Sequence, residues 1–135
     1  MSLEIIERDG IRYAELLRGD GRFAATQFFS PQDSSFQFGV LVQPAGYSEP
    51  AHYHLPVSER EQSMSELIVV QHGSMTISFY SAEGVCFRDV TLGSGDAIVL
   101  VDGVHSYRAV ADVQALVLKQ GPFQNGRDKV LVTAG

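Results

Sequence analysis

The sequence lacks a second cysteine, a long apolar run and a cluster of basic residues. Its only cysteine, Cys86, excludes an intramolecular disulfide, and no segment reaches the about 18 uncharged apolar residues of a membrane span. Ten lysines and arginines stand against sixteen aspartates and glutamates, and the net charge of −6 argues against nucleic acid as a partner. The first residues carry charges where a secretion signal would be apolar, so we expect a cytoplasmic protein without a membrane partner.

Helical periodicity is also missing, whereas turn residues are frequent. Asp9-Gly10 and Asp102-Gly103 have the composition of two-residue hairpin turns. Residues 55–65 contain Pro56 and alternating charges, which predicts a polar loop. We predict a strand that carries the histidines and further strands over residues 3–8, 11–17, 22–29, 36–43, 66–71, 75–80, 85–92, 97–101, 104–110, 113–120 and 129–132. This succession indicates one all-β domain over residues 1–135, an antiparallel sandwich or barrel.

Two histidines at strand spacing indicate a metal site. On an extended strand the side chains of residues i and i+2 point to the same face, so His52 and His54 share a face while Tyr53 points away. Neutral imidazole is a common ligand for zinc, iron, nickel and copper. The spacing therefore predicts an ion held at the face of a sheet.

Two acidic residues compete for the role of the carboxylate ligand. Glu66 opens an apolar strand on the same face as Ile68 and Val70, where a buried carboxylate needs a partner such as a metal. Glu59 lies in the polar loop, where a carboxylate remains in water without a burial cost. Burial favours Glu66, and Glu59 remains the alternative.

The chain resembles the cupin superfamily, and in particular small stand-alone cupins, in two segments. The first cupin signature is a glycine, a His-x-His pair, a glutamate and a second glycine, matched here by Gly46, His52, His54, Glu66 and Gly73. The second signature is matched more loosely by Gly95, Val101-Asp102-Gly103 and His105. The chain departs from the family in the length of the gap before Glu66, which is longer here, and in Val101, which replaces a proline.

The resemblance implies a fold and a ligand set. The fold would be a double-stranded β-helix, the jelly-roll-like barrel of cupins. The ligands of one divalent transition metal (zinc, iron, nickel, manganese or copper) would be His52, His54, Glu66 and His105. Tyr107 follows His105 by two residues and shares its strand face, which would place the phenol inside the barrel near the ion. We therefore predict Tyr107 as the candidate catalytic residue.

Two classes of function fit these residues. The first is a metal-dependent enzyme, such as a dioxygenase or isomerase of the cupin type, that acts on a sugar derivative, a small organic acid or another small polar molecule. The second is a cupin that binds a sugar or another small molecule, such as an anion, without turnover. A positioned proton-transfer residue distinguishes the two classes, and Tyr107 is the candidate.

The N-terminal hairpin predicts an assembly. Its apolar side chains and its free edge require cover, and the apolar residues are Ile5, Ile6, Leu16 and Leu17. Because two-fold symmetry is the commonest closed arrangement, we expect a homodimer.

Three further polar residues lie near the predicted site. Gln43 and Tyr47 flank the turn before the histidine strand and are predicted to line the mouth of the barrel. Lys119 ends a predicted strand and is expected to face solvent, as lysines at strand ends usually do.

Overall fold

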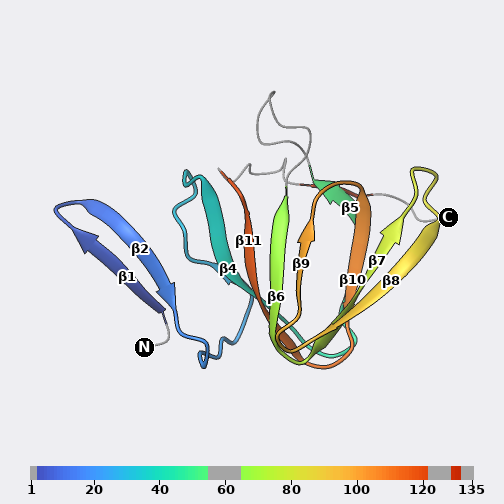
Figure 1. Cartoon of the computed structure of the whole chain (residues 1–135), viewed down its shortest axis with the longest axis horizontal. Coiled ribbons are helices and arrows are strands. Elements are labelled where there is room, and N and C mark those ends of the chain that lie inside the picture. The colour runs from blue at the N-terminus through green and yellow to red at the C-terminus, as the bar shows by residue number, and fades with distance from the viewer. Residues whose placement is uncertain (1–2, 55–64, 122–128, 132–135) are drawn as a thin grey trace.

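The computed structural model describes residues 3–54, 65–121 and 129–131, without the side chains of His54, Lys129 and Val130. All regular structure in this part of the chain is β-strand, which confirms the predicted all-β fold. Figure 1 shows the N-terminal hairpin set to one side of the two larger sheets. None of the described residues belongs to a helix long and apolar enough to cross a membrane.

Two five-stranded antiparallel sheets form the body of the molecule. The first has the order β12-β5-β10-β7-β8, with β5 (Ser48–His54), β7 (Ser74–Tyr80), β8 (Cys86–Gly93), β10 (Val104–Ala109) and β12 (Lys129–Leu131). The second has the order β3-β4-β11-β6-β9, with β3 (Gln27–Phe28), β4 (Phe36–Gln43), β6 (Glu66–His72), β9 (Ala97–Leu100) and β11 (Val113–Gln120). The chain crosses between the sheets repeatedly, as in a jelly roll.

The core lies between the inner faces of these sheets. Met75 and Ile77 of β7 are 0% and 1% exposed, and Val70 of β6 and Ala115 of β11 belong to the same buried cluster. Each buried aliphatic side chain of this size stabilises the fold by about 1.5–3 kcal/mol. Alternation along the strands therefore gives each sheet one apolar face, and the two faces pack on each other.

Two turns follow directly from local sequence. The hairpin of β1 (Leu3–Arg8) and β2 (Ile11–Leu17) turns at Asp9 and Gly10, with φ values of 55° and 76°, as its composition predicts. Gly73, between β6 and β7, has a φ of 82°, and a Cβ there would collide with the carbonyl oxygen of Asp112. Only glycine fits this turn without displacing the backbone.

Most predicted strands have the observed bounds to within one residue at either end, but residues 22–29 do not form one strand. Only β3 within that range pairs with β4. The backbone before it is bound by a buried side chain instead: Gln114 accepts from the amide of Phe23 at 3.0 Å and donates to the carbonyl of Gly21 at 2.8 Å. Residues 55–64 of the predicted polar loop lie outside the described part of the chain.

Candidate functional site

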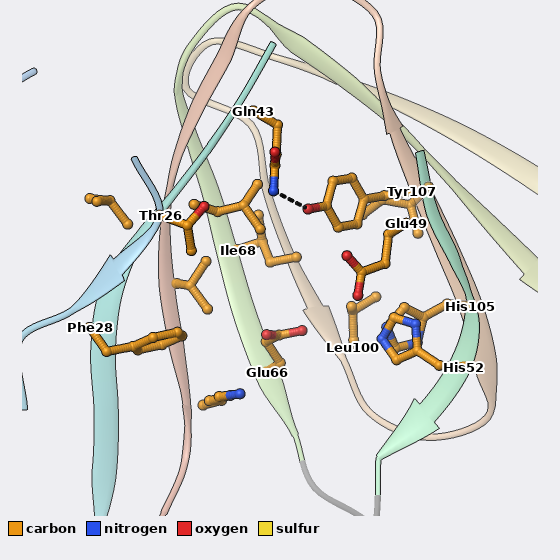
Figure 2. A pocket seen from close by; sticks show the side chains of 15 residues that line it. Thr26, Phe28, Gln43, Glu49, His52, Glu66, Ile68, Leu100, His105 and Tyr107 are labelled. Atoms are coloured by element: carbon orange, nitrogen blue, oxygen red, sulfur yellow. Dashed lines mark hydrogen bonds between the residues drawn. The ribbon is translucent and has the colours of Figure 1, made fainter. Parts of the chain in front are cut away.

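A cavity of about 180 Å³ lies between the two sheets (Figure 2). Its polar lining residues are Thr26, Gln43, Glu49, His52, Glu66, His105, Tyr107 and Lys119. Aliphatic side chains line the rest, namely Val40, Leu41, Ile68, Ile77, Leu100 and Val117, together with Phe28. We call the β5 and β10 side the histidine wall and the β6 and β11 side the lysine wall.

Two of the predicted metal ligands meet on the histidine wall. His52 and His105 are cross-strand partners on β5 and β10, and their ring centroids are 4.4 Å apart. Both are buried, at 4% and 6% exposure, and both line the cavity. Nδ1 of His52 is 2.8 Å from the carbonyl oxygen of Pro50. Because a carbonyl only accepts, Nδ1 carries the proton and Nε2 keeps the lone pair that a metal requires.

The other predicted ligands lie at the ends of their strands. Glu66 is the first residue of β6, is half-buried, and lines the cavity opposite the histidines, as its apolar strand predicts. The backbone of His54 ends β5 and pairs with Lys129, but its side chain lies outside the described part of the structure. The alternative acid, Glu59, also lies outside the described residues.

Glu49 is a second cavity carboxylate that the sequence analysis missed. Strict alternation from His52 would turn Glu49 to the outer face. However, Glu49 pairs with Tyr107 while His52 pairs with His105, so β5 has one residue more than β10 between the two pairs. This β-bulge brings Glu49 to the histidine side of the cavity. The available signal was Pro50, because a proline inside a strand pattern often marks a bulge.

Tyr107 lies inside the cavity, as predicted, and keeps its proton. It is 9% exposed, and Gln43 Nε2 donates to its hydroxyl oxygen at 3.4 Å. Burial and the nearby charge of Glu49 raise the pKa of Tyr107 above its ordinary value, although the bond from Gln43 opposes the shift. Tyr47 packs on its ring at 5.8 Å and donates to Glu49 Oε2 at 3.0 Å. At neutral pH the phenol is therefore a proton donor and not a base.

The expectation that Lys119 faces solvent is wrong. Its side chain is 8% exposed and lines the cavity, with Nζ 5.1 Å from the centroid of the Phe28 ring. Lys119 is the cross-strand partner of Glu66, so opposite charges lie side by side on the lysine wall. The expectation failed because alternation along β11 gives Lys119 the same face as Ala115 and Val117, which are buried in the core, so its place at the strand end does not expose it.

Among the described residues, no three histidine, cysteine, aspartate or glutamate side chains lie close enough together to hold a metal ion. Glu66 and the imidazole pair come from different sheets and face each other across the cavity (Figure 2). The described part of the site therefore supplies two imidazoles and the carboxylate of Glu49 on the histidine wall, and the carboxylate of Glu66 on the lysine wall.

The fold agrees with known structures. A cupin-2 domain protein from Shewanella frigidimarina superimposes with a TM-score of 0.53 at 16% identity, over 75% of this chain and 84% of that one. This chain has the cupin fold. The DMSP lyase DddQ from Ruegeria pomeroyi matches with a TM-score of 0.55 at 24% identity, over 74% of this chain. An oxalate decarboxylase from Lactobacillus farciminis matches with a TM-score of 0.59 at 19% identity, over 82% of this chain.

These likenesses extend to the fold only. This chain covers 44% of the length of the lyase and 33% of that of the decarboxylase, so both contain additional structure. No family model and no curated protein matches the sequence. The cupin fold confirms the double-stranded β-helix that the two signatures predict.

Proposed function

We propose that the protein is a metal-dependent enzyme of the cupin fold that acts on a small polar molecule. One divalent transition metal is held at the cavity by His52, His54, Glu66 and His105. The observation that carries this proposal is the buried pair of imidazoles on the histidine wall. Buried histidines that are cross-strand partners and line the same cavity are the expected ligands of an ion such as zinc, iron, nickel, manganese or copper.

The donor chemistry fits such an ion. The carbonyl of Pro50 fixes the tautomer of His52 and leaves Nε2 as the donor, which is the usual arrangement around metal-bound histidines. The third imidazole is assigned to His54, because strand alternation gives it the same face as His52. Glu66 adds the carboxylate, and Glu49 is the competing acid on the histidine wall.

The proton held by Tyr107 supports an enzyme over a binding protein. A bound ion would polarise an oxygen atom of the substrate and lower the barrier to its reaction. Tyr107 donates a proton to the substrate from the same wall, and the amide of Gln43 orients the hydroxyl. A protein that only bound its ligand would not require a positioned proton donor beside the imidazoles.

The proposal is tested by the metal content of the purified protein. Wild type, His52→Ala, His105→Ala and the control His72→Ala are supplied with each candidate ion, dialysed and measured by mass spectrometry. We expect one ion per chain in wild type and in the control, because His72 does not line the cavity. Both cavity variants lose the ion while circular dichroism remains that of a β-protein. Wild type that takes up no ion, or a control that loses as much as the cavity variants, contradicts the proposal.

We also propose that a second copy of the chain covers the N-terminal hairpin. The hairpin pairs with neither five-stranded sheet, and an isolated hairpin is marginal in water. Ile11 and Tyr13 on β2 are 55% and 66% exposed. Light scattering at micromolar concentration should give the mass of a homodimer, and Tyr13→Asp should shift it toward the monomer. A monomer mass for wild type contradicts this assembly.

A further inference from the structure

The lysine wall places a cation inside the cavity. Lys119 is 8% exposed, a degree of burial that lysine almost never has without a partner. Its side chain also lines a second hollow of about 230 Å³, formed with Phe28, Ser30, Gln32 and Gln37. The side chain of Lys119 therefore lines both spaces.

The neighbours of Lys119 hold this cation in place. The ring of Phe28 lies 5.1 Å from Nζ, within the range of a cation–π contact. On the adjacent strands its partners are Glu66 and Gln37. The amide of Gln37 is directed to backbone carbonyls of the preceding loop, with its shortest bond to Pro31 at 2.9 Å. Lys119 is therefore the cation that this wall presents to a ligand.

The net charge of the cavity determines the sign of the charge on that ligand. The described lining contains two carboxylates, Glu49 and Glu66, and one ammonium, Lys119. A divalent ion at the histidines would leave one net positive charge in a space with apolar walls, where charges are weakly screened. A ligand with one negative charge neutralises the site.

The volume and the lining of the cavity indicate the size of the ligand and the apolar character of its chain. A volume of about 180 Å³ accommodates on the order of six non-hydrogen atoms, at about 30 Å³ for each atom of water size. Between the two polar walls the lining is aliphatic, including Ile68, Ile77 and Leu100. We infer that the substrate is a short-chain carboxylate, with its carboxylate at Lys119 and its other end at the histidine wall. The sign of the ligand's charge and the placement of its other end rest on the proposed metal function.

Butanoate and butanamide test this inference, because they have the same size and differ in charge. Binding to wild type, Lys119→Met, Lys119→Arg and the control Arg88→Met is measured by calorimetry. Arg88 is exposed on β8, so the control removes the same charge away from the cavity. Each protein is studied with metal supplied and after treatment with a chelator, and its folding is checked by thermal melting.

Wild type, Lys119→Arg and Arg88→Met should bind butanoate about tenfold more tightly than butanamide, and Lys119→Met should lose the preference. A preference that survives in Lys119→Met overturns the inference. Equal or undetectable binding of both probes to wild type also overturns it. The metal content is measured separately. Wild type that takes up no metal when it is supplied, but binds butanoate through Lys119, contradicts the proposed function and leaves the carboxylate site standing. Wild type that takes up metal without preferring butanoate contradicts the carboxylate site and leaves the proposed function standing.

Discussion

The two walls of the cavity are built by different means. On the lysine wall the register is regular from Glu66, the partner of Lys119, to Val70, the partner of Ala115, and a register shift follows only between Ala115 and Gln114. The histidine wall contains a bulge, which brings Glu49 to the same side as His52. A regular ladder can place only alternate residues on one face, whereas a bulge adds one more. The bulge on β5 thus brings Glu49 and His52 to the same side of the cavity, whereas the regular stretch from Glu66 to Val70 supplies one pair of opposite charges, Glu66 and Lys119.

The largest effect on metal binding should come from removing the carboxylate that we assign as the metal ligand. Glu66→Gln should weaken metal binding about 10–100-fold, the range seen when supporting or ligating groups are removed. Glu49→Gln should weaken metal binding less than Glu66→Gln does, because the Glu49 carboxylate is already bound to the Tyr47 hydroxyl. Titration of each variant with the metal that wild type retains measures both affinities.

The opposite ranking of the two variants in metal affinity would make Glu49, and not Glu66, the carboxylate ligand. If Glu49→Gln releases the metal and Glu66→Gln keeps it, the ion sits wholly on the histidine wall. Glu66 would then act as the charge partner of Lys119.

The sequence predicts the elements better than the site. Asp9 and Gly10 specify their hairpin locally, because a primed turn requires positive φ at both positions. The strands Phe36–Gln43 and Val113–Gln120 have the predicted bounds, since their β-forming residues agree with the register. These features depend on nearest neighbours in the chain or on simple alternation, and both are visible in a single sequence.

The missed features depend on partners far apart in the chain. Glu49 enters the cavity through a bulge against β10. The side chain of Gln114 replaces strand pairing near Phe23, across 91 positions of the sequence. No local pattern encodes such long-range contacts, although Pro50 was a hint of the bulge.

A smaller effect concerns the contribution of Tyr107 to the stability of the protein at alkaline pH. A tyrosine whose folded-state pKa is raised contributes stability that is fully present below the unfolded value of about 10 and is lost as pH rises toward the folded value. Urea unfolding of wild type should therefore lose up to about 1.4 kcal/mol per pH unit above pH about 10 through this group. Tyr107→Phe should lack that part of the slope.

Tyr53→Phe is the matched control, because Tyr53 is 37% exposed on β5 and does not line the cavity. Its stability should follow wild type across the same pH range. Equal slopes for Tyr107→Phe and wild type would show that the phenol ionises as easily in the folded chain as in the unfolded one.

The smallest expected effect concerns the contact between Phe28 and Lys119 on the lysine wall. Phe28→Leu removes the ring beside the ammonium of Lys119 and leaves an apolar side chain. A cation–π contact of about 0.5–1 kcal/mol would correspond to a change of about two- to fivefold in butanoate affinity. Calorimetry should show this change without a change in metal content, and a loss of metal in Phe28→Leu would show that the two walls are not independent.

The most direct measurement of the central claim is an anomalous difference map from crystals of the metal-loaded protein, recorded at the absorption edge of the ion. One peak per chain is expected in the cavity. For zinc, the peak should lie about 2.0–2.2 Å from Nε2 of His52, from a ring nitrogen of His105 and from a carboxylate oxygen of Glu66. A map without a peak in the cavity, or with a peak that the two histidines do not contact, would contradict the account.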